Sequence, residues 1–256
     1  MAVVTTLAVV ASGLAVFAVV SGRAAAEQQR AAEAFRQIDE SLVVTWQLDD
    51  GDAVAKGSVI GTVEGAMAPI LTGERTALNF LGHLSGVATR TSAFVERAGS
   101  QLRVWDTRKT TPGLRALQKA AVRAGGGRNH RGNLSDWMLL KDNHITGIGI
   151  TEAVQRCRDL WPARTVHVEC DRIEQMVEAI EAGAAAVLLD NMTPDQVREC
   201  VVTARQLAER GHPALIEASG GISLDTIAEY SATGVDQISV SRITQSAPAL
   251  DIGLDV

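Results

Sequence analysis

The sequence has few aromatic residues, few cysteines and few lysines. Aromatic side chains make up 4% of the 256 residues, so the core must be built mainly from Ala, Val, Leu and Ile. Cys157, Cys170 and Cys200 lie far apart, which excludes a disulfide scaffold and a CxxC zinc site and fits a reducing cytosol. With 23 Gly, 6 Pro and a hydrophobic fraction of 46%, the chain is neither collagen-like nor disordered.

Basic residues are concentrated in one part of an acidic chain. The formal net charge of −6 argues against general nucleic-acid binding. Segment 103–141 nevertheless carries nine basic residues and only two acidic ones, a charge of +7, so the rest of the chain carries −13. A basic segment of this kind in an acidic chain indicates either a site that binds an anion or a basic surface exposed to solvent.

Residues 1–22 carry no charge and are mostly apolar. Their length approaches the ~20 residues of a membrane span, and a secretory signal is a second alternative. However, no basic residue precedes the apolar run, and Thr5, Thr6, Ser12 and Gly13 interrupt it. We therefore predict two buried strands joined by a turn at Ser12-Gly13, in a cytoplasmic protein without a membrane segment.

The next part of the chain is predicted to mix helices and strands. The amphipathic pattern predicts a helix over about 24–39, strands within 42–48 and 54–63, and one or two long helices over 72–98. The strand pair is similar to the hairpins of biotinyl or lipoyl carrier domains. Segment 64–68 has no lysine at the position of their attachment site, so we do not expect a swinging-arm role.

From residue 102 onward, strands alternate with helices. This alternation is typical of a parallel sheet, and the number of units favours an α/β barrel with a catalytic face at the carboxyl ends of its strands. The predicted strands are 102–106, 137–141, 165–169, 186–190, 214–218 and 237–241.

Cations cluster at or near these strand ends. Arginine grips a carboxylate or phosphate with two hydrogen bonds, and lysine adds a point charge. We therefore expect one anionic ligand to be bound by Arg108, His130, Arg131 and Lys141. His144 is interpreted as a structural hydrogen-bonding residue.

Two carboxylates, Glu169 and Asp190, end successive strands. They are candidates for binding Mg²⁺ through water, for hydrogen bonds to sugar hydroxyls, or for stabilising an oxocarbenium ion. A glycosidase pair is an alternative, although such a site does not need so many cations. After the following strand, Ser219, Gly220 and Gly221 predict a turn that opens a helix, whose N–H groups suit a phosphate.

Several segments resemble quinolinate phosphoribosyltransferases, in order along the chain from about residue 26 to 256. The most specific are DTRKTTPGLR, GGGRNHR and LLKDNHI. The others are ERTALNFLGHLSGVATRT, VHVEC, AAVLLDNM, IEASGGISLDTIAEYSATGVDQISVS and SAPALDIGLDV.

The resemblance implies a smaller N-terminal α/β sandwich domain and a seven-stranded, incomplete α/β barrel. It implies domains at 1–90, completed by 245–256, and at 91–244. It also implies a homodimer with shared active sites that, with Mg²⁺ and without a redox cofactor, converts quinolinate and phosphoribosyl pyrophosphate to nicotinate mononucleotide, pyrophosphate and CO₂ in de novo NAD biosynthesis.

The motif match also implies residue roles. Lys109, Lys141, Glu169 and Asp190 are the implied catalytic residues: Lys109 meets the phosphoribosyl donor, and the two carboxylates serve the ribose and Mg²⁺. Quinolinate is held by Arg75 of the neighbouring subunit and by Arg108, His130, Arg131 and Lys141. The phosphate is held by Ser219, Gly220, Gly221 and Ser241.

The sequence departs from the family pattern at a few positions. Asn133 and Ser241 stand where the family has glycine, Gln245 stands for histidine, and an opening helix is expected to be absent. Two alternatives remain: an inactive barrel that binds or scaffolds, and the paralogue of molybdenum-transport operons, which uses a different phosphoribosyl acceptor. That paralogue tends to lose the lysine that Lys141 matches.

Overall fold

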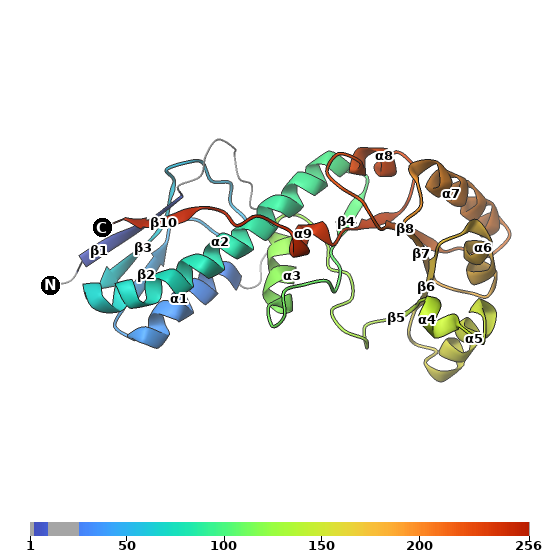
Figure 1. Ribbon diagram of the computed structural model, residues 1–256, viewed down its shortest axis with the longest axis horizontal. Helices are drawn as coiled ribbons and strands as arrows, with labels where there is room; N and C mark the ends of the chain where they lie inside the picture. Colours follow the sequence, from blue (N-terminus) through green and yellow to red (C-terminus); the bar gives the residue numbers. More distant parts are fainter. Residues whose placement is uncertain (1–2, 10–25, 256) are drawn as a thin grey trace. The chain divides into compact units, whose positions relative to one another are not determined.

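The structure, a computed structural model, describes residues 3–9 and 26–255 (Figure 1). The chain divides into two compact units. The first comprises residues up to 93 together with 109–128 and 242–256, and the second comprises 94–108 and 129–241. The predicted turn at Ser12-Gly13 and the strand expected after it lie outside the described residues.

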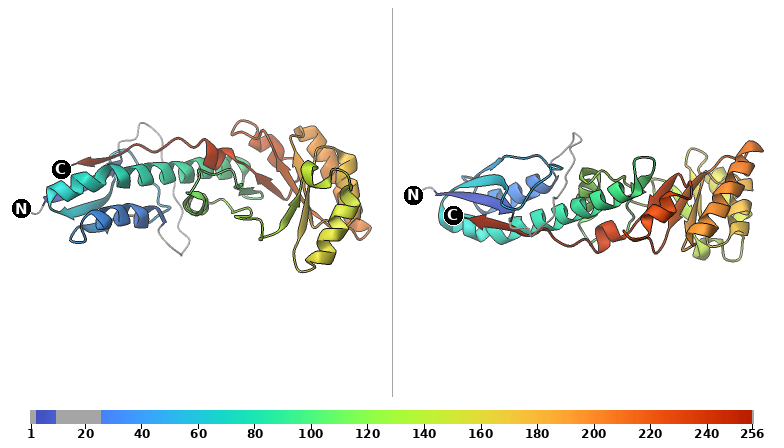
Figure 2. Two further views of the ribbon diagram at one scale, coloured as in Figure 1. Left: turned by 60° about the horizontal axis from the view of Figure 1, so that its bottom comes forward. Right: turned by 90° about the horizontal axis from the view of Figure 1, so that it is seen from above.

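The first unit contains a four-stranded sheet in the order β10-β1-β3-β2. All of its ladders are antiparallel, and the last strand of the chain pairs with the first, with Thr6 opposite Asp255 (Figure 2). The strands are β1 (Val3–Val9), β2 (Val43–Trp46), β3 (Val59–Gly65) and β10 (Ile252–Asp255).

Two helices supply most of the core of this unit. They are α1 (Ala26–Ile38) and α2 (Met67–Ala98), and their apolar side chains meet Val63 of β3 and Ile252 of β10. The buried cluster includes Phe35, Ile70, Ala77, Leu78 and Leu81. The unit also holds the short helices α3 (Arg115–Ala124) and α9 (Arg242–Gln245).

The second unit contains a parallel sheet of six strands in the order β4-β9-β8-β7-β6-β5. Each strand overlaps a predicted strand, and the predicted α/β architecture is confirmed; the seventh strand stays a prediction. The strands are β4 (Arg103–Trp105), β5 (Met138–Leu140), β6 (Val166–Cys170), β7 (Ala186–Asp190), β8 (Leu215–Ser219) and β9 (Gln237–Ser239).

The two faces of this sheet differ in chemistry. One face carries fully buried apolar side chains, such as Val168, Leu189 and Ile216, and it is covered by helices (Figure 1). Because side chains alternate along a strand, the neighbours of these residues point to the other face. Some of those neighbours are polar, and Glu169, Asp190 and Glu217 among them belong to the site described below. The helices are α4 (Asp142–Ile145), α5 (Ile150–Leu160), α6 (Ile173–Glu181), α7 (Pro194–Glu209) and α8 (Ile227–Ser231).

In the described part of the chain, no helix is long and apolar enough to cross a membrane. The helix predicted over 24–39 and the strand within 42–48 are found as α1 and β2. The segment 72–98 belongs to one helix, α2, which begins at Met67. The strand material expected over 54–63 is confined to β3, which begins only at Val59.

Candidate active site

The six parallel strands place the predicted residues of the second unit at one edge. Lys141 follows β5, Glu169 is the next-to-last residue of β6, Asp190 ends β7 and Ser219 ends β8. Asp190 is paired with Ser219 in the ladder, so the two residues lie side by side. Parallel strands that end at one edge bring side chains from distant parts of the sequence together.

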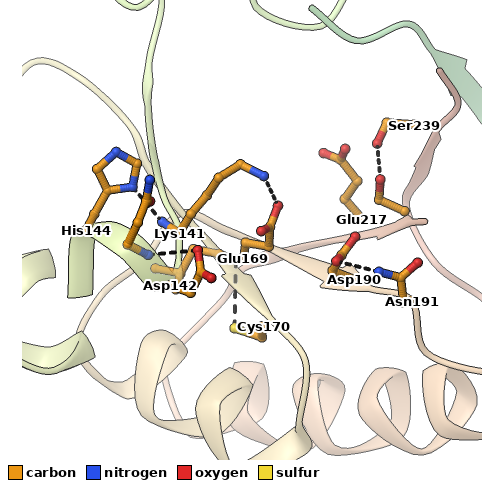
Figure 3. Close-up of polar contacts among 12 residues, drawn as sticks. Lys141, Asp142, His144, Glu169, Cys170, Asp190, Asn191, Glu217 and Ser239 are labelled. Atoms are coloured by element: carbon orange, nitrogen blue, oxygen red, sulfur yellow. Dashed lines mark hydrogen bonds and ion pairs between the residues drawn. The ribbon is translucent and has the colours of Figure 1, made fainter. Parts of the chain in front are cut away.

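Lys141 and Glu169 form an ion pair between Lys141 Nζ and Glu169 Oε2 (Figure 3). The Lys141 side chain is 38% exposed and that of Glu169 is 19% exposed, so the pair is accessible to a ligand. The backbone N–H of Lys141 donates to Nδ1 of His144 at 3.0 Å, which fixes the start of α4. His144 therefore has the structural role that the sequence indicated.

Asp190 and Glu169 point to the same side of the sheet as Glu217, away from the covering helices, whereas Cys170 points toward them (Figure 3). Oδ2 of Asp190 accepts a hydrogen bond from Nδ2 of Asn191 at 2.7 Å. In the described residues, no group of three or more His, Cys, Asp or Glu side chains is arranged to hold a metal ion.

The turn after β8 is tightly constrained at its first glycine. Gly220 has a φ of 87°, and a Cβ there would lie 2.3 Å from Oδ1 and 2.7 Å from the backbone N of Asn191. Gly221 also has a positive φ, 65°, but a Cβ would enter open space. Oγ of Ser239 donates to Oγ of Ser219 at 3.1 Å, which ties this turn to β9.

We expect Gly220→Ala to destabilise the protein more than Gly221→Ala. Both variants force an L residue into a left-handed conformation, which costs about 1–2 kcal/mol. Only Gly220→Ala adds an overlap with the backbone of Asn191, which cannot swing aside. Denaturant unfolding of both variants measures the difference. Equal losses of unfolding free energy would contradict the contact with Asn191.

The helix after this turn differs from the prediction. The sequence predicts a helix that opens at the glycines, but α8 begins at Ile227 and has five residues. The intervening segment is a turn in which the backbone N–H of Ser223 donates to Oγ1 of Thr226 at 3.0 Å. The expectation that a helix N-terminus directly follows Gly221 is therefore wrong, because Ser and Thr side chains hold the backbone in a turn.

Two guanidinium groups come close to each other in the second unit. Arg131 is 6% exposed, and burial together with the charge of Arg108 lowers its pKa, while Glu169 and Asp136 act in the opposite direction. A buried cation next to a second cation is stabilised when an anion binds between them. This arrangement therefore favours an anionic ligand over a solvated basic face.

His130 is fixed by a buried aspartate that the sequence prediction missed. Asp106 is fully buried after β4; its Oδ1 accepts the backbone N–H of His130 and its Oδ2 accepts Nδ2 of Asn129, both at 2.8 Å. The ring of His130 makes edge contacts with Trp105 and Trp137, at centroid distances of 6.3 and 4.9 Å. The loop that carries His130 is thus locked to the end of β4.

A second buried acid, Glu217 of β8, was also missed. It is 1% exposed, its Oε2 lies 3.3 Å from Nε2 of His130, and the same oxygen accepts Nε2 of Gln237 at 2.6 Å. The signal was present in the sequence: Glu217 is two residues before Ser219, so the alternation of a strand places both on one face.

Lys109 and Arg75 belong to the first unit. The backbone O of Lys109 accepts Oγ1 of Thr244 at 2.9 Å. The side chain of Arg75 is 73% exposed and lies 3.4 Å from Glu74 Oε1. Arg75 lies on the polar face of α2, next to the buried residues Ala77 and Leu78.

A parallel α/β sheet with cations and carboxylates gathered at its carboxyl edge is an arrangement suited to an enzyme that acts on anionic ligands. Comparison with known families gives the particular class. Residues 3–85 match the family described as "Quinolinate phosphoribosyl transferase, N-terminal domain", and residues 87–255 match its C-terminal domain. The chain belongs to the quinolinate phosphoribosyltransferase family.

Individual relatives agree with this assignment. The chain is 43% identical over 229 residues to the probable nicotinate-nucleotide pyrophosphorylase [carboxylating] of Bacillus subtilis, covering 88% of this chain and 76% of that protein. It is 42% identical over 215 residues to the nicotinate-nucleotide pyrophosphorylase [carboxylating] of Mycobacterium leprae, covering 83% of this chain and 75% of that protein. The solved structure of the Francisella tularensis nicotinate-nucleotide pyrophosphorylase superposes with a TM-score of 0.89 at 35% identity, covering 100% of this chain and 86% of that one.

The predicted family is therefore confirmed, and with it the class of enzyme, a phosphoribosyltransferase. The individual site residues and the domain boundaries at 90 and 244 stay predictions. The two family domains meet near residue 86, inside α2.

Proposed function

We propose that the protein transfers the phosphoribosyl group of phosphoribosyl pyrophosphate to the ring nitrogen of quinolinate and releases pyrophosphate and CO₂. The product is nicotinate mononucleotide, a precursor of NAD. The observation that carries the proposal is the meeting of the Lys141–Glu169 pair with Asp190 and the Ser219 turn at one edge of the parallel sheet. This is the arrangement that a dicarboxylate and a phosphorylated sugar require.

The cationic side chains of the site bind quinolinate, the acceptor of the phosphoribosyl group. Quinolinate carries two carboxylates, and Arg108, His130, Arg131 and Lys141 supply positive charge and N–H donors for them. When ribose bonds to the ring nitrogen, that nitrogen becomes cationic and stabilises the carbanion left by the departing CO₂. The cations at the carboxylates hold the ring in place during both steps, which is positional catalysis.

The carboxylates of the site act on phosphoribosyl pyrophosphate, the donor of the phosphoribosyl group. Departure of pyrophosphate leaves positive charge on the anomeric carbon, and Glu169 or Asp190 stabilises that charge. Lys109 meets the pyrophosphate side of the donor. The 5′-phosphate is assigned to Ser219, Gly220, Gly221 and Ser241.

Mg²⁺ fits the same carboxylates. It is usually held in proteins by one or two carboxylates together with substrate phosphates, rather than by a cage of protein ligands. Glu169 and Asp190 lie on adjacent strands and point to the same side, which supports their joint use. With these carboxylates and the donor phosphates as ligands, a Mg²⁺ ion would supply positive charge to offset that of the leaving pyrophosphate. We assign no redox cofactor, no nucleic acid and no membrane, and a cytoplasmic location.

We further assign a homodimer in which Arg75 completes the site of the other subunit. Its exposure on α2 supports this role, since an exposed pair with Glu74 contributes little to stability. Arg75→Ala and Lys141→Ala should each be inactive. Subunit exchange should recover about a quarter of the wild-type activity, because half of the dimers are mixed and each mixed dimer has one intact site of two. If no activity is recovered, Arg75 acts in the active site of its own subunit or takes no part in the reaction.

The experiment that tests the proposed function is an assay of CO₂ release that depends on both quinolinate and phosphoribosyl pyrophosphate. Nicotinate should not replace quinolinate, because a site built for two carboxylates leaves cations unpaired when one is missing. Equal turnover of nicotinate would contradict the specificity. Turnover of another acceptor without quinolinate activity would favour the paralogue of molybdenum-transport operons. Binding without any turnover would favour an inactive barrel.

A further inference from the structure

A buried glutamine of the first unit, Gln118 of α3, has no role in the reaction described above. Its side chain is fully buried. The amide oxygen Oε1 accepts the backbone N–H of Thr111 at 2.8 Å. The amide nitrogen Nε2 lies 2.9 Å from Nε2 of His83, 3.2 Å from Oγ1 of Thr111 and 3.3 Å from the backbone O of Thr244. One side chain therefore joins α2, α9 and the segment that precedes α3.

The partners of Gln118 determine the orientation of its amide. A backbone N–H can only donate, and a backbone carbonyl can only accept. The atom that faces the N–H of Thr111 is therefore the oxygen, and the atom that faces the carbonyl of Thr244 is the NH₂ group. Because an NH₂ group donates, Nε2 of His83 accepts and carries no proton. Burial lowers the pKa of His83, which agrees with a neutral ring.

Two of these partners belong to parts of the first unit that pack closely together. The backbone N–H of Leu250 donates to the backbone O of Gly82 at 2.8 Å. A Cβ at Gly82 would lie 2.7 Å from the backbone O of Leu250, and one at Gly86 would lie 2.0 Å from that of Pro248. Gly82 and Gly86 flank His83 on α2, so this part of α2 and the C-terminal segment form one firm support.

The third partner belongs to the segment 109–111, with which the chain enters the first unit again after β4. Oγ1 of Thr244 donates to the backbone O of Lys109 at 2.9 Å, and Gln118 makes two hydrogen bonds with Thr111. Both ends of the segment are thus tied to the same support. If its backbone shifted, the ammonium group of Lys109 would shift with it.

We propose that Gln118 is a positioning residue that holds the segment 109–111 where Lys109 can meet the phosphoribosyl donor. The proposal rests on the proposed function for the identity of that donor, phosphoribosyl pyrophosphate. A fully buried side chain does not reach a substrate, so Gln118 acts through the backbone of Thr111. Neutral His83 keeps the amide of Gln118 in the orientation that this contact requires.

The test is Gln118→Met, which keeps a side chain of similar size and removes both the acceptor and the donor. In calorimetry of the 256-residue chain, phosphoribosyl pyrophosphate should bind at least about tenfold more weakly than to the wild type. Affinity for quinolinate should change by less than about threefold, because none of the cations assigned to quinolinate belongs to the segment 109–111. Unchanged affinity for the donor, or an equal loss for both substrates, would overturn the proposal.

Gln28→Met is the matched control. Gln28 of α1 is a second buried glutamine of the first unit, 9% exposed, and its Nε2 donates to the backbone O of Leu48. This variant loses a side-chain hydrogen bond to a different segment, so both substrate affinities should stay within about twofold of the wild type. A loss of donor affinity as large as that in Gln118→Met would overturn the proposal, because any buried glutamine of the unit would then have the same effect.

A second measurement does not depend on a substrate. In the protein without ligands, the backbone N–H of Thr111 loses its acceptor in Gln118→Met and should exchange with solvent at least about tenfold faster. The amides of β3 should keep their protection. Unchanged exchange at Thr111, or faster exchange throughout the first unit, would overturn the proposal. If the exchange changes as expected and the wild type does not bind phosphoribosyl pyrophosphate, the proposed function is contradicted, and Gln118 is still shown to hold the segment.

The ring of His83 provides a third measurement. In the ¹⁵N spectrum of the histidines, the signal that is lost in His83→Gln identifies this ring. The wild-type ring should be neutral, with its proton on Nδ1, because the hydrogen bond at Nε2 selects this tautomer. A proton on Nε2 would overturn the proposal, since the amide of Gln118 could not then donate to it.

Discussion

Replacing Lys141 with alanine is expected to weaken quinolinate binding by roughly 10- to 150-fold, the equivalent of about 1.5–3 kcal/mol for a hydrogen bond between charged groups. Two effects add. The ammonium group no longer meets a substrate carboxylate, and Glu169 loses its ion-pair partner beside the incoming dianion. Binding of phosphoribosyl pyrophosphate should change much less. Calorimetry with each substrate separately measures both affinities.

A matched control is available in the same unit. Arg156→Ala also removes a cation from an ion pair, that with Glu152, but both side chains are more than half exposed on α5. Such surface pairs contribute about 0–1 kcal/mol, so this variant should keep both substrate affinities and nearly all of its stability. Unchanged quinolinate affinity in Lys141→Ala would remove Lys141 from the acceptor site.

Replacing Asn129 with aspartate is expected to lower the free energy of unfolding by about 3 kcal/mol. The change places a second carboxylate 2.8 Å from buried Asp106 and removes the donor that Asp106 accepts. The loop that carries His130 and Arg131 should loosen, so quinolinate affinity should fall with stability. Denaturant unfolding and calorimetry measure the two quantities.

The exchange of the two residues provides the control. In the double variant Asp106→Asn and Asn129→Asp, the asparagine amide donates to the new aspartate and its oxygen still accepts the backbone N–H of His130. Both hydrogen bonds are restored, and most of the lost stability should return. A double variant no more stable than Asn129→Asp alone would contradict this geometry.

The Asn129→Asp variant should also respond to pH in a defined direction. Two adjacent carboxylates raise the pKa of one of them in the folded state. Above about pH 4 the unfolded chain releases this proton, whereas the folded protein still holds it. The free energy of unfolding of this variant therefore falls as the pH rises from about 4 to the raised pKa of the folded state. Comparison with the wild type at several pH values isolates the effect.

The architecture could be predicted from the sequence because the patterns that define it lie in short, continuous segments. Apolar strands such as 186–190, each followed by a turn and an amphipathic helix, define the parallel sheet without tertiary information. The same pattern places Lys141, Glu169, Asp190 and Ser219 at strand ends, and the structure brings these residues to one edge.

What could not be predicted depends on partners distant in the sequence. Asp106 and Glu217 are acidic residues inside the protein, and their contacts with His130, Asn129 and Gln237 help to account for their burial. The exposure of Arg75 also depends on which side of α2 packs against the sheet. The mixed pattern of polar and apolar residues in this helix does not determine that side.

The pairing of β1 with β10 has a consequence for synthesis on the ribosome. Because Val9 lies opposite Ile252, the small sheet cannot be completed until β10 has been translated, long after β1. Until then one edge of β1 lacks its partner and can pair with a strand of another nascent chain. The parallel sheet uses only residues 103–239, so it can form earlier. We therefore expect the second unit to fold while the chain is still being synthesised. The first unit should need either protection by a chaperone or assembly after the chain has left the ribosome.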